Sequence, residues 1–160
     1  MALGKEETYR LIEQLLWIIE DYFVLASTPK TYGTDTLYHR LDIHLIDTIG
    51  KNEGINVTEI ARIHKITKSA VSQAVKKLEK RDLVDRYQAP ENRKEVLFRL
   101  TEEGKKAFDA HLDFHNRVEK PFAADLAKLS PVEASGIHKL VEALKRRAEL
   151  VRKLETEQPE

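Results

Sequence analysis

The sequence predicts a mainly α-helical fold that carries one small antiparallel β-hairpin, on three observations. Hydrophobic residues recur at helical spacing over most of the chain, whereas residues 83–100 change to the alternating pattern of strands. Two capping boxes mark helix starts, one at Asn56 with Glu59 and one at Ser130 with Glu133. At 160 residues, the chain has the length of one domain with a substantial core.

The N-terminal part is expected to form two helices joined by a loop. An amphipathic stripe predicts the first helix over residues 4–27. Charged and amide side chains interrupt this stripe, so the segment is neither a signal peptide nor a membrane span, and no membrane partner is expected. The second helix is expected to begin at Asp35 and to be stopped by Gly50 and Gly54.

Two shorter helices are expected next. The first covers residues 58–64, with Ile60, Ala61 and Ile63 turned inward. The second begins after Thr67, a good N-cap residue, and ends near Arg81. One face of this second helix is apolar and must be buried; it is formed by Val71, Ala74, Val75 and Leu78. The opposite face suits base edges and phosphates; it is formed by Ser69, Ser72, Gln73, Lys76 and Lys80.

A β-hairpin and two long helices complete the chain. The strands are expected over residues 83–87 and 95–100, around a turn at 89–92. Thr101 is then expected to cap a long fifth helix, whose first turn carries two glutamates that suit the helix dipole. Ser130 opens the last helix, with proline in its first turn.

Charge is distributed unevenly along a chain with no net charge. Between Arg62 and Arg99, eleven lysines and arginines face five acids, so this stretch carries +6 and the remainder carries −6. A basic module on an acidic body is typical of a protein that binds DNA. The chain has no cysteine, which excludes disulfides, thiol redox sensing and cysteine metal sites, and a cytoplasmic location is expected.

A helix pair joined by a tight turn and followed by a two-stranded wing is a winged helix-turn-helix. We expect this DNA-binding lobe to cover residues 35–101 of a chain that forms one structural unit over 1–160. Residues 1–34 and 102–160 then supply helices with too much apolar surface for one small domain. These helices are expected to form a homodimer, which would read a pseudo-palindromic site in double-stranded DNA.

The run TEIARIHKITKSAVSQAVKKLEKRDLVDR, followed by PENRKEVLFRLTEEGKKAF, resembles the MarR-type (multiple-antibiotic-resistance) transcriptional regulators. The resemblance covers residues 38–108, and the terminal helices agree only in length and pattern. It implies a dimeric regulator, usually a repressor, that responds to a small-molecule or metal effector. The recognition helix would place six residues over the major groove: Lys68, Ser69, Ser72, Gln73, Lys76 and Lys77.

The wing departs from the family pattern. MarR-type wings usually read Asp-x-Arg, with the arginine in the minor groove, whereas this chain has Asn92 and Lys94 with Arg93 between them. Arginine is favoured in a narrow minor groove because lysine is more strongly hydrated. Arg93 and Lys94 are therefore both candidates for the minor-groove contact, and Arg86 is a third basic residue expected at the DNA.

Histidines provide a candidate effector site. His111 and His115 are four residues apart on the fifth helix, on a stripe that is expected to face inward. Neutral histidines at this spacing commonly bind zinc. His44 on the second helix and Glu20 on the first could complete four ligands. The resemblance supports this set, because a zinc-sensing subgroup of the family uses a first-helix acid, a second-helix histidine and an HxxxH pair.

Several alternatives remain at this point. A small aromatic ligand between the dimer body and the DNA-binding lobe is the alternative to Zn²⁺, and no cofactor is required in either case. A winged helix that binds protein instead of DNA is the alternative function. An enzyme is not expected, because the glycines are scattered and the serines on the basic helix have no general base nearby.

Overall fold

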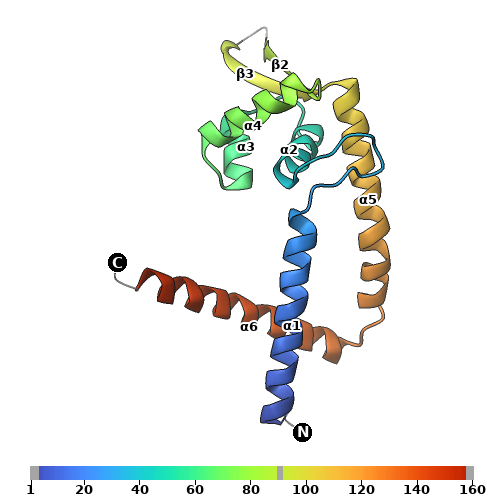
Figure 1. Ribbon diagram of the computed structural model, residues 1–160, viewed down its shortest axis with the longest axis vertical. Coiled ribbons are helices and arrows are strands. Elements are labelled where there is room, and N and C mark those ends of the chain that lie inside the picture. Colours follow the sequence, from blue (N-terminus) through green and yellow to red (C-terminus); the bar gives the residue numbers. More distant parts are fainter. Residues whose placement is uncertain (1–3, 90–91, 158–160) are drawn as a thin grey trace. The chain divides into compact units, whose positions relative to one another are not determined.

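The computed structural model describes residues 4–89 and 92–157, which form two compact units divided between Phe114 and His115 (Figure 1). The described part is mainly helical with one three-stranded antiparallel sheet, as the sequence predicts apart from the third strand. The helices are α1 (Lys5–Ser27), α2 (Arg40–Lys51), α3 (Val57–His64), α4 (Lys68–Lys80), α5 (Glu102–Leu126) and α6 (Pro131–Thr156). The strands are β1 (Ile55–Asn56), β2 (Val84–Ala89) and β3 (Asn92–Leu100).

The core of the first unit lies between α2, α3, α4 and the sheet. The apolar face predicted for α4 is buried as expected: Val71, Ala74, Val75 and Leu78 are each at most 6% exposed. Ile60 and Ala61 of α3 join the same core. The prediction for Ile63 was wrong, because this side chain is 45% exposed. An eight-residue helix that packs on one side has room for only a narrow buried stripe.

Helix α2 begins later than expected, at Arg40 instead of Asp35. Lys30 and Tyr38 form an isolated antiparallel bridge, in which each backbone N–H donates to the other residue's carbonyl at 2.9–3.0 Å. These bonds hold the chain extended up to the helix N-cap, His39, where ψ is 155°. Gly50 also differs from the expectation, because it lies inside α2 and does not end it.

The sheet has the strand order β1-β3-β2. β2 and β3 form the expected wing, in which Val84 pairs with Leu100 and Arg86 with Phe98. β1 is a third strand that the sequence analysis missed, and its Ile55 pairs with Phe98. Two residues are too short for an alternating pattern to be visible in sequence. β1 leads directly into α3, so it ties the start of the helix-turn-helix to the wing.

Helix α5 starts against the turn that joins α4 to β2. Thr101 caps the helix as predicted, because its Oγ1 accepts from the Gly104 N–H at 3.0 Å. The same hydroxyl donates to the Asp82 carbonyl at 2.6 Å. A Cβ at Gly104 would lie 1.9 Å from the Leu83 carbonyl oxygen. Only glycine therefore allows α5 and the turn to approach so closely.

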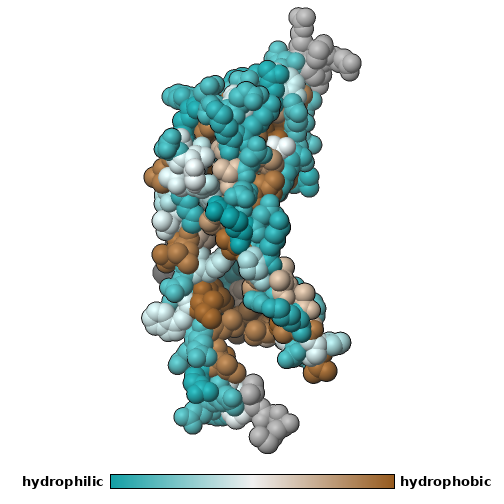
Figure 2. Space-filling model, turned by 90° about the vertical axis from the view of Figure 1, so that its right-hand side faces the viewer, coloured by the Kyte–Doolittle hydropathy of each residue, from teal (hydrophilic) through white to brown (hydrophobic). Residues whose placement is uncertain are grey.

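The terminal helices have the predicted hydrophobic faces. Neither α1 nor α6 has a buried residue within the chain itself. Large side chains with aromatic rings lie at the surface of α1, including Trp17, Tyr22 and Phe23, each more than 60% exposed. Figure 2 shows brown, hydrophobic residues at the surface of the molecule. The capping box predicted at Ser130 and Glu133 is present at the start of α6. No helix among the described residues is long and apolar enough to cross a membrane.

Gly104→Ala is expected to destabilise the fold by about 1–3 kcal/mol, because the added methyl group forces the backbone of Leu83 away from α5. Gly136→Ala is the matched control. Gly136 lies in α6, and a methyl group added there would have no neighbour within 4 Å, so alanine should raise helix stability slightly. Urea unfolding of the two variants measures the difference. Equal stabilities would contradict the close contact at Gly104.

Candidate nucleic-acid interface and histidine cluster

The helix-turn-helix is formed by α3 and α4, and the two helices are held at defined ends. Asn56 and Glu59 form the predicted capping box at the start of α3. Lys65 ends α3 in the left-handed conformation, with φ 54°. Thr67 then caps α4 by accepting from the Ala70 N–H at 3.2 Å. The turn between the helices is therefore only a few residues long, and each end of it is fixed by hydrogen bonds.

The face of α4 opposite the core is polar and exposed. Lys68, Gln73, Lys76 and Lys77 are exposed there, and Ser72 is half-buried. Ser72 Oγ donates to the Lys68 carbonyl at 2.9 Å, and Ser69 Oγ lies 3.0 Å from Thr67 Oγ1. The six residues predicted to face the major groove therefore share one helix. Five of them, all but Ser72, combine a hydrogen-bond donor with an exposed side chain, which suits contacts to phosphates and base edges.

Arg86 of the wing lies in a bidentate ion pair with α4. Its Nε and Nη2 donate to the two carboxylate oxygens of Glu79 at 2.6 and 3.0 Å. The hydrogen bond from Arg86 holds the pKa of Glu79 below its ordinary value, and the positive charge acts in the same direction. This geometry makes Arg86 a clamp between β2 and the recognition helix. Arg86 was predicted to contact DNA; its ion pair with Glu79, an acid seven residues earlier in the chain, was not predicted.

The tip of the wing lies outside the part of the chain that can be described in full. The side chains of Arg93 and Lys94 are among those outside the described residues, so the predicted minor-groove contact stays a prediction. The base of the wing is described. There Asn56 Nδ2 donates to Glu95 Oε1 at 2.6 Å, which links β3 to the capping residue of α3.

Arg81 is a second anchor of α4 that the sequence analysis missed. It follows the last residue of the helix, and its Nη1 donates to Asp42 Oδ2 of α2 at 3.1 Å. Its Nη2 donates to the Leu37 carbonyl at 2.9 Å, and the guanidinium lies over the Tyr38 ring. The C-terminal end of α4 is therefore held by α2 and by the loop before it.

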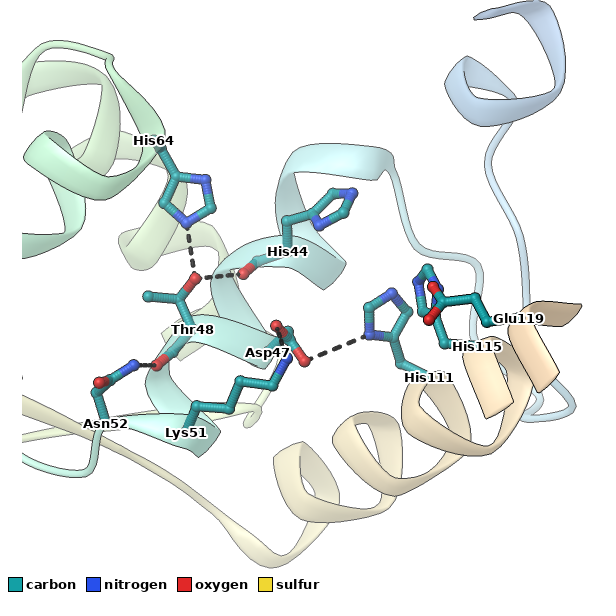
Figure 3. A network of polar contacts seen from close by, with 9 residues as sticks. All are labelled: His44, Asp47, Thr48, Lys51, Asn52, His64, His111, His115 and Glu119. Carbon is teal, nitrogen blue, oxygen red and sulfur yellow. Dashed lines mark hydrogen bonds and ion pairs between the residues drawn. The ribbon is translucent and has the colours of Figure 1, made fainter. Parts of the chain in front are cut away.

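A cluster of aromatic rings with one acid, Asp47, lies where α2 faces α5. The His44 and His111 rings meet edge to face, with centroids 5.7 Å apart, and Asp47 Oδ1 lies 3.8 Å from His111 Nδ1 (Figure 3). The Tyr32 ring packs edge to face against two other rings: its centroid lies 5.1 Å from that of His111 and 5.2 Å from that of Phe114. His111 is only 3% exposed, as expected for an inward-facing residue. We call these residues the histidine cluster.

The four residues predicted to bind metal lie in different surroundings. His44 and His111 are adjacent, whereas Glu20 is exposed on α1. The His115 side chain is 39% exposed, which is more than expected, and its Nδ1 lies 2.7 Å from Glu119 Oε1. No group of three His, Asp or Glu residues in the described ranges is arranged to hold a metal ion. Asp47 is a nearby acid that the sequence analysis missed, although its i+3 spacing from His44 could have indicated it.

Comparisons with known proteins agree with this architecture. The family model described as MarR family matches residues 40–96. The HTH-type transcriptional regulator PchR of Bacillus subtilis (strain 168) is 38% identical over 64% of this chain and 60% of its own length. The uncharacterized HTH-type transcriptional regulator YhjH of the same organism is 38% identical over 61% of this chain and 56% of its own length. The chain thus spans less than two thirds of the curated relatives it matches.

Solved structures extend the similarity to most of the fold. FabT of Streptococcus pneumoniae in complex with DNA is 21% identical, with a TM-score of 0.67 over 90% of this chain and 99% of that one. ZitR of Lactococcus lactis, described as a zinc-responsive MarR family member, is 21% identical, with a TM-score of 0.71 over 88% and 98%. At this identity the likeness concerns the fold.

Proposed function

Since the chain belongs to the MarR family of winged helix-turn-helix regulators, we propose that it is a sequence-specific DNA-binding transcriptional repressor that acts as a homodimer. The observation that carries this proposal is α4, with its apolar face fully in the core and its lysine-rich face exposed. FabT, a protein of similar fold, is described in complex with DNA. The relatives are regulators and not enzymes, in agreement with the expectation that the chain is not an enzyme.

A homodimer is supported by the surface of the terminal helices. The apolar side chains of α1 and α6 would face water in a monomer, and soluble monomers rarely leave so many large apolar side chains exposed. We propose a second copy of the chain as the partner that covers them. Two-fold symmetry would then present two recognition helices to successive major grooves of a pseudo-palindromic operator.

The proposed effector site is the histidine cluster, with two candidate ligands. Zn²⁺ is favoured by the donor chemistry, because imidazole nitrogens and carboxylate oxygens are usual zinc ligands. In that case His44, His111 and His115 would hold the ion, with Glu20 as the proposed acid and Asp47 beside His111. ZitR, which has a similar fold, is described as zinc-responsive, and this supports Zn²⁺ as a candidate. A small aromatic ligand is favoured instead by the ring edges of Tyr32 and Phe114.

Either effector would act by favouring one of two arrangements of the DNA-binding lobes. Helix α2 contributes His44 and Asp47 to the cluster and packs against α4 on another side. A ligand that binds one arrangement more tightly shifts the population towards it. The change in DNA affinity can be no larger than the ratio of ligand affinities for the two arrangements.

DNA binding is expected to fall more than about a hundredfold in the variant Lys76→Glu with Arg93→Glu, because both changes place negative charge beside phosphates. The matched control is Lys105→Glu with Lys106→Glu, two exposed lysines at the start of α5 and outside α1 and α6, which changes the net charge equally and should bind as the wild type does. The probe is a duplex that the wild type selects from a random-sequence pool, with binding measured by fluorescence anisotropy.

Salt dependence separates the two candidate functions of the winged helix. Wild-type affinity for the selected duplex should fall steeply with salt, with a slope of about −0.9 per neutralised phosphate. The DNA-binding proposal fails if the wild type selects no duplex. It also fails if the variant Lys76→Glu with Arg93→Glu binds the selected duplex as the wild type does. A protein-interaction module then becomes the better description.

Zinc binding is expected at about one ion per chain after chelator treatment and reloading, and His111→Ala with His115→Ala should abolish it. The matched control removes two exposed histidines elsewhere, by His39→Ala with His138→Ala, and should bind as the wild type does. Elemental analysis of the desalted proteins measures the stoichiometry. Unchanged zinc in the His111 and His115 variant would contradict a zinc site there and favour the aromatic ligand.

A further inference from the structure

Thr48 lies on α2 directly after the histidine cluster but contacts a different helix. His44 and Asp47 face His111 of α5, whereas the Thr48 side chain meets His64 of α3 (Figure 3). Thr48 is only 7% exposed, and it is one of two polar residues that are buried among the described residues. A single turn of α2 therefore contacts both the candidate effector site and the helix-turn-helix.

The Thr48 hydroxyl makes two short hydrogen bonds. Its Oγ1 donates to the His44 carbonyl at 2.9 Å and lies 2.8 Å from His64 Nε2. A hydroxyl has a single hydrogen, so the oxygen accepts from the Nε2–H of His64. The Thr48 carbonyl in turn accepts from Asn52 Nδ2 at 2.8 Å. The polar groups of Thr48 are thus fully engaged, and the contact to His64 has a defined direction.

His64 is the last residue of α3, at the point where the chain turns towards the recognition helix. The next residue, Lys65, is left-handed, and the Ile66 N–H donates back to the Ala61 carbonyl at 3.2 Å. Thr67, the N-cap of α4, follows immediately. A bond that fixes the end of α3 therefore also fixes where α4 begins.

Burial favours the neutral form of His64. Its partly buried position lowers the pKa of the imidazole, and the charge of Asp47 opposes this only in part. At neutral pH the ring is therefore uncharged, and its single N–H donates to Thr48 Oγ1. Replacing Thr48 by an apolar residue would leave this donor without its acceptor in a half-buried place, which costs more than the bond itself contributes.

Hydrophobic packing alone does not determine how the helix-turn-helix is oriented on α2. The contacts of α4 with α2 and α3 are largely apolar, and apolar contacts are non-directional. The Thr48–His64 bond supplies a directional contact from α2 to α3 at the turn itself. We infer that Thr48 and His64 are positioning residues for DNA binding, which act through their hydrogen bond by holding the helix-turn-helix in its DNA-reading orientation on α2. This inference rests on the proposed DNA-binding function.

Thr48→Val tests the bond, because valine has the shape of threonine without the hydroxyl. We expect its affinity for the selected duplex to fall about tenfold, equivalent to about 1.4 kcal/mol. The salt slope should not change, since neither residue belongs to the α4 face or the wing that is proposed to contact phosphates. Thr48→Ser is the matched control: it keeps the hydroxyl and should restore binding to within about twofold of the wild type. Circular dichroism and thermal melting establish that each variant is folded at the temperature of the assay.

His64→Ala removes the same bond from the side of His64, which is only partly buried. If the bond is responsible, the double variant Thr48→Val with His64→Ala should bind no more weakly than the weaker single variant. Additive losses, wild-type affinity in folded Thr48→Val, or failure of Thr48→Ser to restore binding would each overturn the inference. A wild type that selects no duplex would instead contradict the proposed function, so the two failures are distinguishable.

Discussion

Burial of one face of α4 is the constraint on which the rest of the DNA-binding unit depends. Val71, Val75 and Leu78 are almost completely buried against α2, α3 and the sheet. The free energy of this burial fixes the rotation of the helix about its own axis, since turning it would expose the apolar side chains to water. The lysines and Gln73 on the other side then have to face solvent. A surface suited to DNA is in this sense a consequence of the core.

Rotation about the helix axis is only one degree of freedom, and directional polar contacts restrict the others. Glu79 clamps the middle of the wing to α4 through Arg86, and Arg81 ties the end of α4 to Asp42 of α2. Thr48 ties α2 to the end of α3. Helix α2 takes part in two of these three contacts and also carries His44 of the histidine cluster. It is therefore the element through which a change at the cluster would most directly reach the recognition helix.

Local signals could be read from the sequence, and contacts between distant segments could not. The capping boxes at Asn56 and Ser130 and the buried stripe of α4 depend on neighbouring residues, and all three are present. The late start of α2 depends on the bridge between Lys30 and Tyr38, which no periodic pattern announces. Likewise, β1 forms only because β3 lies beside it. The proximity of Tyr32 and Asp47 to His111 depends on long-range packing of the same kind. The sequence therefore indicated the histidines of the candidate site but not these two neighbours.

The central claim is that the exposed face of α4 lies in the major groove of bound DNA. The chain has no cysteine, so a single cysteine introduced as Gln73→Cys can carry an iron chelate that cleaves DNA close to it. On a selected duplex, cleavage is predicted in two major-groove regions about one helical turn apart. The same chelate on Glu13→Cys of α1 should cleave weakly or not at all. Bound DNA that is left intact by the chelate at position 73, or cleaved equally from both positions, would contradict a recognition role for α4.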